Sequence, residues 1–171
     1  HIEAGPHQSA KETLYGYIPE FIRNLENYRS TEHLNYDLIH SHYWLSGSVG
    51  MYLGQSWKIP HVTTFHTLAK AKLRARVGEL ESNLRVSEEQ KIVSEVNSII
   101  VSTEQEKQDL IQLYGASKEK IEVVSPGVDT DQFRPKDKIE ARKELGFTDD
   151  KVVLYVGRIE PLKGLDILIT A

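Results

Sequence analysis

Short apolar runs alternate with helix-like segments along this chain, and this alternation restricts the fold more than any other feature of the sequence. Runs rich in β-branched and aromatic residues predict strands at 36–42, 59–66, 98–103, 120–129 and 151–157. Helical spacing and helix-boundary signals predict helices at 9–28, 44–57, 82–97, 102–115, 138–146 and 162–171, with a kink or two successive helices at Pro19. Such an alternation is typical of βα units, so we predict an α/β fold with a parallel sheet and flanking helices.

Composition and charge exclude several classes of protein. The 171 residues are enough for one ordinary domain, and the formal net charge of −4 argues against broad nucleic-acid binding. The chain has no cysteine, which excludes disulfides and thiolate metal sites and is compatible with a cytoplasmic location. No run approaches the roughly 20 apolar residues of a membrane span. Because the chain starts without Met and stops within a predicted helix, we interpret it as a fragment of a longer protein.

The predicted sheet indicates where ligands would bind. Ligands of parallel sheets gather beyond the carboxyl ends of the strands. This rule selects four places in the chain, at 40–44, 65–72, 125–129 and 157–163. The polar stretch at 129–137 is the best candidate for a domain boundary, because a new helix–strand set follows it.

Histidines lie at the ends of two predicted strands. His40 and His42 are two residues apart and would share one face of a strand, where such a pair could hold a metal. No third ligand is evident, so we favour a structural His40 and a polar cleft lined by 42–44. His66 ends the next strand, where it could act as a base, a donor or a carbonyl-positioning group. A purely structural histidine is an equal alternative there.

Two pairs of charged residues have recognisable spacing. Arg85 and Glu89 lie four residues apart on a predicted helix, and the residues alone favour a surface ion pair. Arg158 and Lys163 follow the last predicted strand, and a guanidinium fork, an ammonium group and the N-terminus of the next helix suit a diphosphate. The chain has neither a GxxxxGK[ST] loop nor a GxGxxG loop, so a solvated loop stays open as the alternative.

Six segments, taken in order, are more specific than any of these pairs: "AGP....KE.L", "DLIHSHYWLSG", "TFHTLAKAK", "IIVSTEQEK", "VVSPGVDTDQF" and "VGRIEPLKGLDILI". Together they resemble the family 4 retaining glycosyltransferases, above all the sucrose-phosphate synthase group and the mycothiol-type enzymes, which transfer N-acetylglucosamine to inositol phosphate. That family has the GT-B fold, with two Rossmann-like domains facing a cleft. The resemblance implies that residues 1–134 are the later part of the acceptor-binding domain. Residues 135–171 would then begin the nucleotide-sugar-binding domain.

The resemblance also implies residues for the donor site. Arg158 and Lys163 match the pair that binds the donor diphosphate, where they would neutralise the leaving nucleotide as the glycosidic bond breaks. Gly127, in the Pro–Gly turn, is a further donor-site residue. His66 matches the histidine of the "FHT" element, which would hold a donor hydroxyl near the reacting sugar. The three catalytic candidates are therefore His66, Arg158 and Lys163.

For the acceptor site, the resemblance implies four residues that grip a phosphate group in the mycothiol-type enzymes. These are Lys11, Tyr43, Thr67 and Arg85. This match overrides the surface ion pair as the interpretation of Arg85, because cations from distant segments can meet at one phosphate. The expected acceptor is thus a phosphorylated sugar or polyol.

The function implied for the full-length enzyme is transfer of a sugar from a nucleotide-sugar, a UDP-sugar, with retention of anomeric configuration. Neither a metal nor another cofactor is expected, since the Arg–Lys pair and the helix dipole would supply the electrostatic stabilisation. The family's early Gly-rich loop would precede His1, and its E-x7-E element would follow Ala171. The fragment by itself is therefore expected to be inactive.

Two other functions stay open. One is a family 4 enzyme with a lipid or polysaccharide acceptor, in which the basic segment 70–76 would make peripheral contact with a membrane. The other is a non-catalytic α/β binding module. The sequence gives no prediction of the oligomeric state.

Overall fold

The chain divides into two compact units, His1–Ser125 and Pro126–Ala171. A computed structural model describes residues 1–75, 80–160 and 163–171, and for Lys11 and Glu12 it describes the backbone alone. The division falls at the Pro–Gly turn after the fourth strand. The predicted domain boundary at 134/135 lies within the second unit and stays a prediction.

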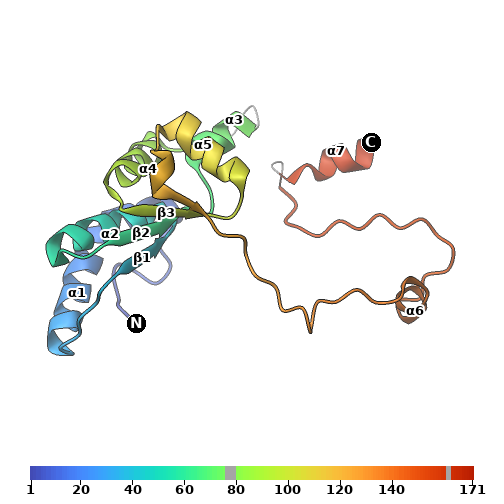
Figure 1. Ribbon diagram of the computed structural model, residues 1–171, viewed down its shortest axis with the longest axis horizontal. Helices are drawn as coiled ribbons and strands as arrows, with labels where there is room; N and C mark the ends of the chain where they lie inside the picture. Colours follow the sequence, from blue (N-terminus) through green and yellow to red (C-terminus); the bar gives the residue numbers. More distant parts are fainter. Residues whose placement is uncertain (76–79, 161–162) are drawn as a thin grey trace. The chain divides into compact units, whose positions relative to one another are not determined.

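The first unit is built on a parallel sheet whose four strands follow one another in chain order (Figure 1). The strands are β1 (Ile39–His42), β2 (His61–Thr64), β3 (Ser98–Val101) and β4 (Ile121–Val123). In the register of the sheet, Ser41 lies opposite Thr63, which lies opposite Ile99 on its other side. These strands confirm the first four that the sequence predicts, and they confirm the parallel sheet.

Helices precede and connect these strands. They are η1 (Lys11–Tyr17), α1 (Ile18–Thr31), α2 (Tyr43–Trp57), α3 (Ala69–Ala75), α4 (Asn83–Glu95), α5 (Glu104–Tyr114) and η2 (Lys118–Lys120). Pro19 lies in the first turn of α1, where its missing N–H is not needed, so the predicted break there is confirmed as two successive helices. The Thr103 hydroxyl caps α5 by accepting from the Glu106 N–H at 3.2 Å, and Gly115 ends this helix at φ 66.

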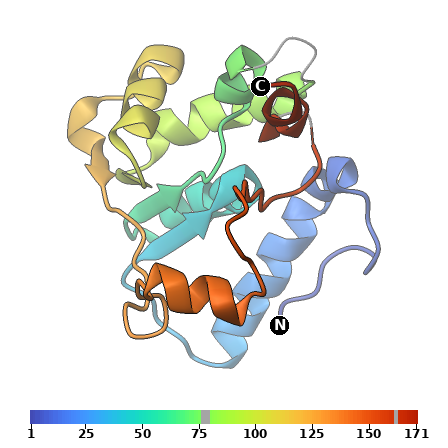
Figure 2. The same cartoon turned by 90° about the vertical axis from the view of Figure 1, so that its right-hand side faces the viewer.

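The core of the first unit lies between the sheet and the helices. Figure 2 shows α4 and α5 above the strands in that view. The largest buried cluster comprises Trp44, Phe65, Leu68, Ile92, Val93, Val96, Ile99, Val101, Leu110, Tyr114, Ala116 and Ile121. Glycines let α2 approach its neighbours closely, because a Cβ at Gly47 would lie 2.8 Å from Cδ1 of Ile92, and one at Gly50 would lie 2.4 Å from Nε2 of His61.

The second unit contains α6 (Lys138–Glu144) and α7 (Leu165–Thr170). Both helices were predicted. The strand predicted at 151–157 is wrong, because these residues form no strand in the structure. A strand needs hydrogen-bonding partners on a neighbouring strand, and the described part of the second unit contains none. The apolar side chains of this segment are accordingly exposed, Val153 and Leu154 to 79% and Val156 to 85%.

Among the described helices of both units, none combines the length and the apolar character that a bilayer crossing requires.

Candidate functional site

Three histidines gather at the carboxyl edge of β1 and β2. Nδ1 of His42 lies 2.8 Å from Nε2 of His66, and Nε2 of His40 lies 3.0 Å from the Thr64 hydroxyl. The rings of His42 and His66 are stacked, with centroids 5.1 Å apart. Burial and the nearby His42 and His66 lower the pKa of His40. The edge therefore presents a chain of imidazoles in which His66 is exposed and held by His42.

Backbone strain marks the same edge. Tyr43 directly follows β1 with φ 74, and His66 lies just beyond β2 with φ 59. Left-handed backbone is unfavourable for residues with a Cβ and persists where the surrounding structure enforces it, often at functional sites. The sequence could not have shown this, because neither residue is a glycine or an asparagine.

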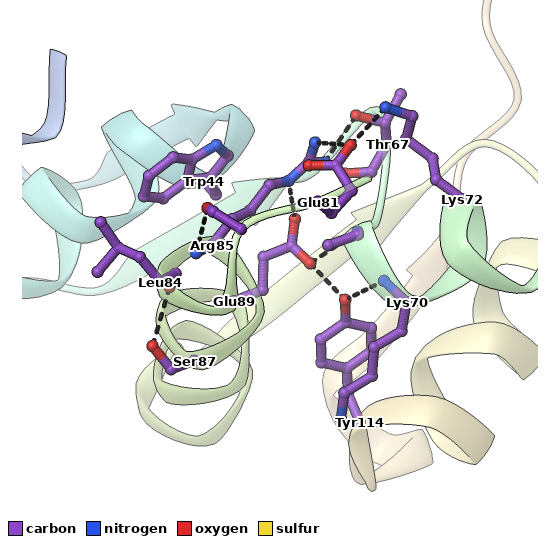
Figure 3. A network of polar contacts seen from close by, with 12 residues as sticks. Trp44, Thr67, Lys70, Lys72, Glu81, Leu84, Arg85, Ser87, Glu89 and Tyr114 are labelled. Atoms are coloured by element: carbon purple, nitrogen blue, oxygen red, sulfur yellow. Dashed lines mark hydrogen bonds and ion pairs between the residues drawn. The ribbon is translucent and has the colours of Figure 1, made fainter. Parts of the chain in front are cut away.

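Arg85 contacts residues of this edge from the first turn of α4 and is only 3% exposed (Figure 3). Its Nη2 donates to the carbonyl oxygen of Thr67 at 2.9 Å and to the Thr67 hydroxyl at 3.0 Å. Its guanidinium carbon lies 5.0 Å from the centre of the Tyr43 ring, which is a cation–π contact. The structure thus brings together three of the four predicted acceptor residues. The side chain of Lys11, the fourth, lies outside what the structure describes.

Two carboxylates accept the other hydrogen bonds of Arg85. Nε donates to Glu89 at 2.7 Å, and Nη1 donates to Glu81 at 3.0 Å. The Arg85–Glu89 pair that the spacing indicated is therefore present, but it is buried instead of lying on the surface. Burial alone would lower the pKa of Arg85, but its hydrogen bond to Glu89 and the charges of Glu89 and Glu81 raise it above its usual value.

Glu89 is fully buried and connects α4 to two other helices. Besides Arg85, it accepts from the Ala69 N–H at 2.9 Å and from the Tyr114 hydroxyl. Burial and this hydrogen bond raise the pKa of Tyr114. The Tyr114 hydroxyl in turn accepts from the Lys70 N–H at 3.0 Å. Glu89 thus fixes the position of the helix that carries Arg85.

Three cations of the basic segment 70–76 form hydrogen bonds or ion pairs within the first unit. The Lys70 ammonium donates to the Leu113 carbonyl at 2.7 Å, and Arg74 donates to Asp109 at 2.6 Å. Lys72 is paired with Glu81. Arg76 lies outside the described residues. These contacts give the described part of this segment a structural role, and membrane contact by it stays an untested expectation.

The predicted donor residues lie in the second unit. Arg158 is 77% exposed on its side chain and pairs with Glu160 at 2.8 Å. Lys163 is also exposed and precedes Gly164, the N-cap of α7 at φ 65. A Cβ at Gly127 would meet no described atom within 4 Å, so nothing in the described part of the second unit requires a glycine there. The donor roles of these residues stay predictions.

Among the described residues, neither a metal centre nor the cavity at the other edge of the sheet gives a second candidate site. The described residues bring together no three histidine or carboxylate side chains that could hold a metal ion, and the expectation that no metal is needed stays a prediction. A cavity at the opposite, amino-terminal edge of the sheet is lined by Met51, Lys58, His61, Asn97 and their neighbours. None of the predicted site residues lines it.

The chain matches a known protein family and is similar to named enzymes. Residues 4–132 match the family described as Glycosyltransferase Family 4. The D-inositol 3-phosphate glycosyltransferase 2 of Catenulispora acidiphila is 42% identical over 176 aligned positions, which cover 100% of this chain and 41% of that protein. The D-inositol 3-phosphate glycosyltransferase of Mycobacterium tuberculosis is 48% identical over 139 positions, which cover 80% of this chain and 29% of that protein.

Solved structures also resemble this chain. Sucrose-phosphate synthase from Thermosynechococcus elongatus matches with a TM-score of 0.84 and 29% identity, over 99% of this chain and 42% of that one. Anabaena HepE in complex with UDP matches with a TM-score of 0.67 and 21% identity over 88% of this chain and 39% of that one, a likeness of fold alone. The chain spans about two fifths of the length of the first curated relatives that it matches.

Proposed function

Because the chain belongs to glycosyltransferase family 4 and its parallel sheet is the Rossmann-like sheet of the GT-B fold, we propose that the full-length protein transfers a sugar from a nucleotide-sugar donor to a phosphorylated sugar or polyol. The donor would be a UDP-sugar, and the anomeric configuration would be retained.

The observation that carries this proposal is the assembly of Arg85, Thr67 and Tyr43 at the carboxyl edge of the sheet. A guanidinium in contact with a hydroxyl and an aromatic ring is suited to a phosphate group. The names of the relatives agree with this assignment, since they describe enzymes of inositol 3-phosphate and of sucrose phosphate.

His66 is the residue of the first unit proposed to contact the donor sugar. It is exposed, it directly follows β2, and its Nε2 is occupied by His42. The other ring nitrogen of His66, Nδ1, has no hydrogen-bond partner among the described residues. This nitrogen would contact a donor hydroxyl. The backbone strain at His66 supports a role that requires this orientation.

Arg158 and Lys163 are proposed to bind the donor diphosphate. Both are exposed cations of one short segment, and the partner of Arg158 is a solvent-exposed carboxylate. An exposed ion pair of this kind is worth little, so exchanging Glu160 for a phosphate costs little. As the glycosidic bond breaks, negative charge develops on the leaving nucleotide, and these two cations would stabilise it.

The proposal is tested by a screen of the full-length protein. UDP-glucose and UDP-N-acetylglucosamine are each offered with inositol 3-phosphate and with hexose phosphates, and in parallel with the same acceptors without phosphate. We expect transfer to at least one phosphorylated acceptor and a much lower kcat/KM for its dephosphorylated form. Equal transfer to both forms, or transfer only to lipid or polysaccharide acceptors, would contradict the proposal.

A further inference from the structure

The Glu81 carboxylate bridges two cations at the candidate acceptor site. It accepts from Nη1 of Arg85 at 3.0 Å and also from the ammonium group of Lys72 (Figure 3). Lys72 belongs to α3 and Arg85 to α4, so one anion joins two helices. Glu81 was not indicated by the sequence pattern, whereas Lys72 is the last residue of the stretch 65–72, where the strand-end rule predicts ligand binding.

The surroundings of Glu81 keep it charged. Burial alone would raise its pKa, but the hydrogen bond from Lys72 and the charges of Arg85 and Lys72 outweigh burial and hold the pKa below its usual value. Glu81 also directly precedes Ser82, the N-cap of α4, where the helix dipole favours an anion. The place that Glu81 occupies is therefore built to hold a negative charge.

The two carboxylate partners of Arg85 differ in how firmly they are held. Glu89 is 0% exposed and accepts from Arg85, Ala69 and Tyr114. Glu81 is 10% exposed, and within the part of the chain that the structure describes it accepts hydrogen bonds from Arg85 and Lys72. Displacing Glu89 would leave buried donors without an acceptor, which is costly. Among the described residues, displacing Glu81 leaves two cations, Lys72 and Arg85, that need a new acceptor.

We propose that Glu81 is the internal occupant of the acceptor's phosphate site, and that a phosphate monoester binds by displacing it from Lys72 and Arg85. This inference rests on the proposed function, in which the acceptor is phosphorylated. Three donors would then face the phosphate: the ammonium group of Lys72, Nη1 of Arg85 and the Thr67 hydroxyl, whose oxygen already accepts from Arg85. A phosphate monoester carries nearly two negative charges at neutral pH, so it competes well with one carboxylate.

A consequence is selectivity for charge. An unphosphorylated acceptor cannot replace the charge of Glu81. Glu81 therefore stays bound to Lys72 and Arg85, and neither cation is available to that acceptor. Lys72 thereby becomes a specificity-determining residue alongside Arg85. The Glu81 carboxylate competes with the acceptor's phosphate group for both cations.

The kinetic test uses the full-length protein and the Glu81→Gln variant, which keeps the shape of the side chain and removes its charge. A weaker competitor should lower the KM for the phosphorylated acceptor about three- to tenfold, because a neutral hydrogen bond is roughly half as strong as a charge-assisted one. The KM for the nucleotide-sugar should not change. Lys72→Met should raise the KM for the phosphorylated acceptor about tenfold. The matched control is Glu122→Gln, which removes an exposed carboxylate of β4 and should change neither constant.

A binding measurement separates this inference from the proposed function. Inorganic phosphate is titrated calorimetrically into the full-length wild-type protein and into the Glu81→Gln and Lys72→Met variants. We expect phosphate to bind more tightly to Glu81→Gln and more weakly to Lys72→Met. If this order is found but no phosphorylated acceptor receives sugar, the anion site stands and the proposed function fails. If sugar is transferred but Glu81→Gln leaves phosphate affinity and acceptor KM unchanged or worse, the displacement of Glu81 is wrong.

Discussion

The two units of the chain use similar apolar segments to opposite effect. In the first unit, Ile99 of β3 pairs with strands on both sides and is 0% exposed. In the second unit, the run around Val153 has equally apolar residues, but it forms no strand and Val153 is 79% exposed. An apolar run thus becomes a strand only where neighbouring strands satisfy its backbone.

Ion pairs also differ in burial between the two units. Arg85 and Glu89 are 3% and 0% exposed on their side chains, whereas Arg158 and Glu160 are 77% and 39% exposed. A buried pair organises the structure around it, and an exposed pair leaves its cation available to a ligand. The acceptor candidates are thus prearranged in the first unit, while the donor candidates are exposed in the second.

The largest effect is expected from breaking the buried pair. Glu89→Gln leaves the Arg85 guanidinium buried without a full counter-charge, and we expect the free energy of unfolding of the first unit to fall by about 3–5 kcal/mol. Urea denaturation of the full-length protein, followed by hydrogen exchange of β3, measures this loss. Glu144→Gln, which removes the exposed partner of Lys136, is the control and should cost less than about 1 kcal/mol. Equal effects of the two variants would show that burial does not distinguish the pairs.

A slightly smaller effect on stability is expected from truncating a buried side chain of an apolar run. Ile99→Ala creates a cavity in the core and should destabilise the first unit by about 2–5 kcal/mol, again measured by denaturation. Val153→Ala, at an exposed position, should change stability by less than about 0.5 kcal/mol. A comparable loss in Val153→Ala would mean that the segment around it is packed in the full-length protein.

The exposed cations of the second unit should matter for activity and not for stability. Arg158→Ala and Lys163→Ala should each lower kcat/KM for the nucleotide-sugar by about 100-fold or more, because each removes a donor to the developing negative charge. Steady-state kinetics of the full-length protein measure this loss, and Lys136→Ala is the matched control, as an exposed cation of the same unit. Unchanged activity in both Arg158→Ala and Lys163→Ala would remove the diphosphate assignment.

The smallest effect is a pH dependence confined to the first unit. His61 is buried between β1 and α2, and burial together with the nearby His40 lowers its pKa from 6.5 to about 4. The unfolded state binds this proton at higher pH than the folded state, so stability is complete above pH 6.5 and falls as the pH drops toward 4. The expected loss in the free energy of unfolding is roughly 2–3 kcal/mol. Denaturation at several pH values measures it, and His61→Asn should flatten the dependence.

Much of the first unit could be predicted from sequence because its signals are local. Apolar runs predicted the four strands, and spacing indicated the Arg85–Glu89 pair. Helix-boundary signals predicted a helix at 102–115, where Thr103 caps α5 and Gly115 ends it. The likeness of ordered motifs to a known family added Tyr43, Thr67 and Arg85, which the structure brings together.

What sequence reasoning missed depends on contacts between distant segments. The burial of Glu89 involves Tyr114, which is 25 residues away, and the Glu81 carboxylate accepts from Lys72 of α3 and from Arg85 of α4. The left-handed backbone of Tyr43 and His66 is imposed by the surrounding structure and not by these residue types. The missing strand at 151–157 is the converse case, in which a local pattern lacks the neighbours that it needs.

The binding of a phosphorylated acceptor at the carboxyl edge of the first unit's sheet is tested most directly by a structure of the full-length protein with inositol 3-phosphate. The phosphate should lie within hydrogen-bonding distance of Lys72 and Arg85, with the Glu81 carboxylate turned away from both. A phosphate bound elsewhere, with Glu81 still bridging the two cations, would contradict both the acceptor site and the displacement of Glu81.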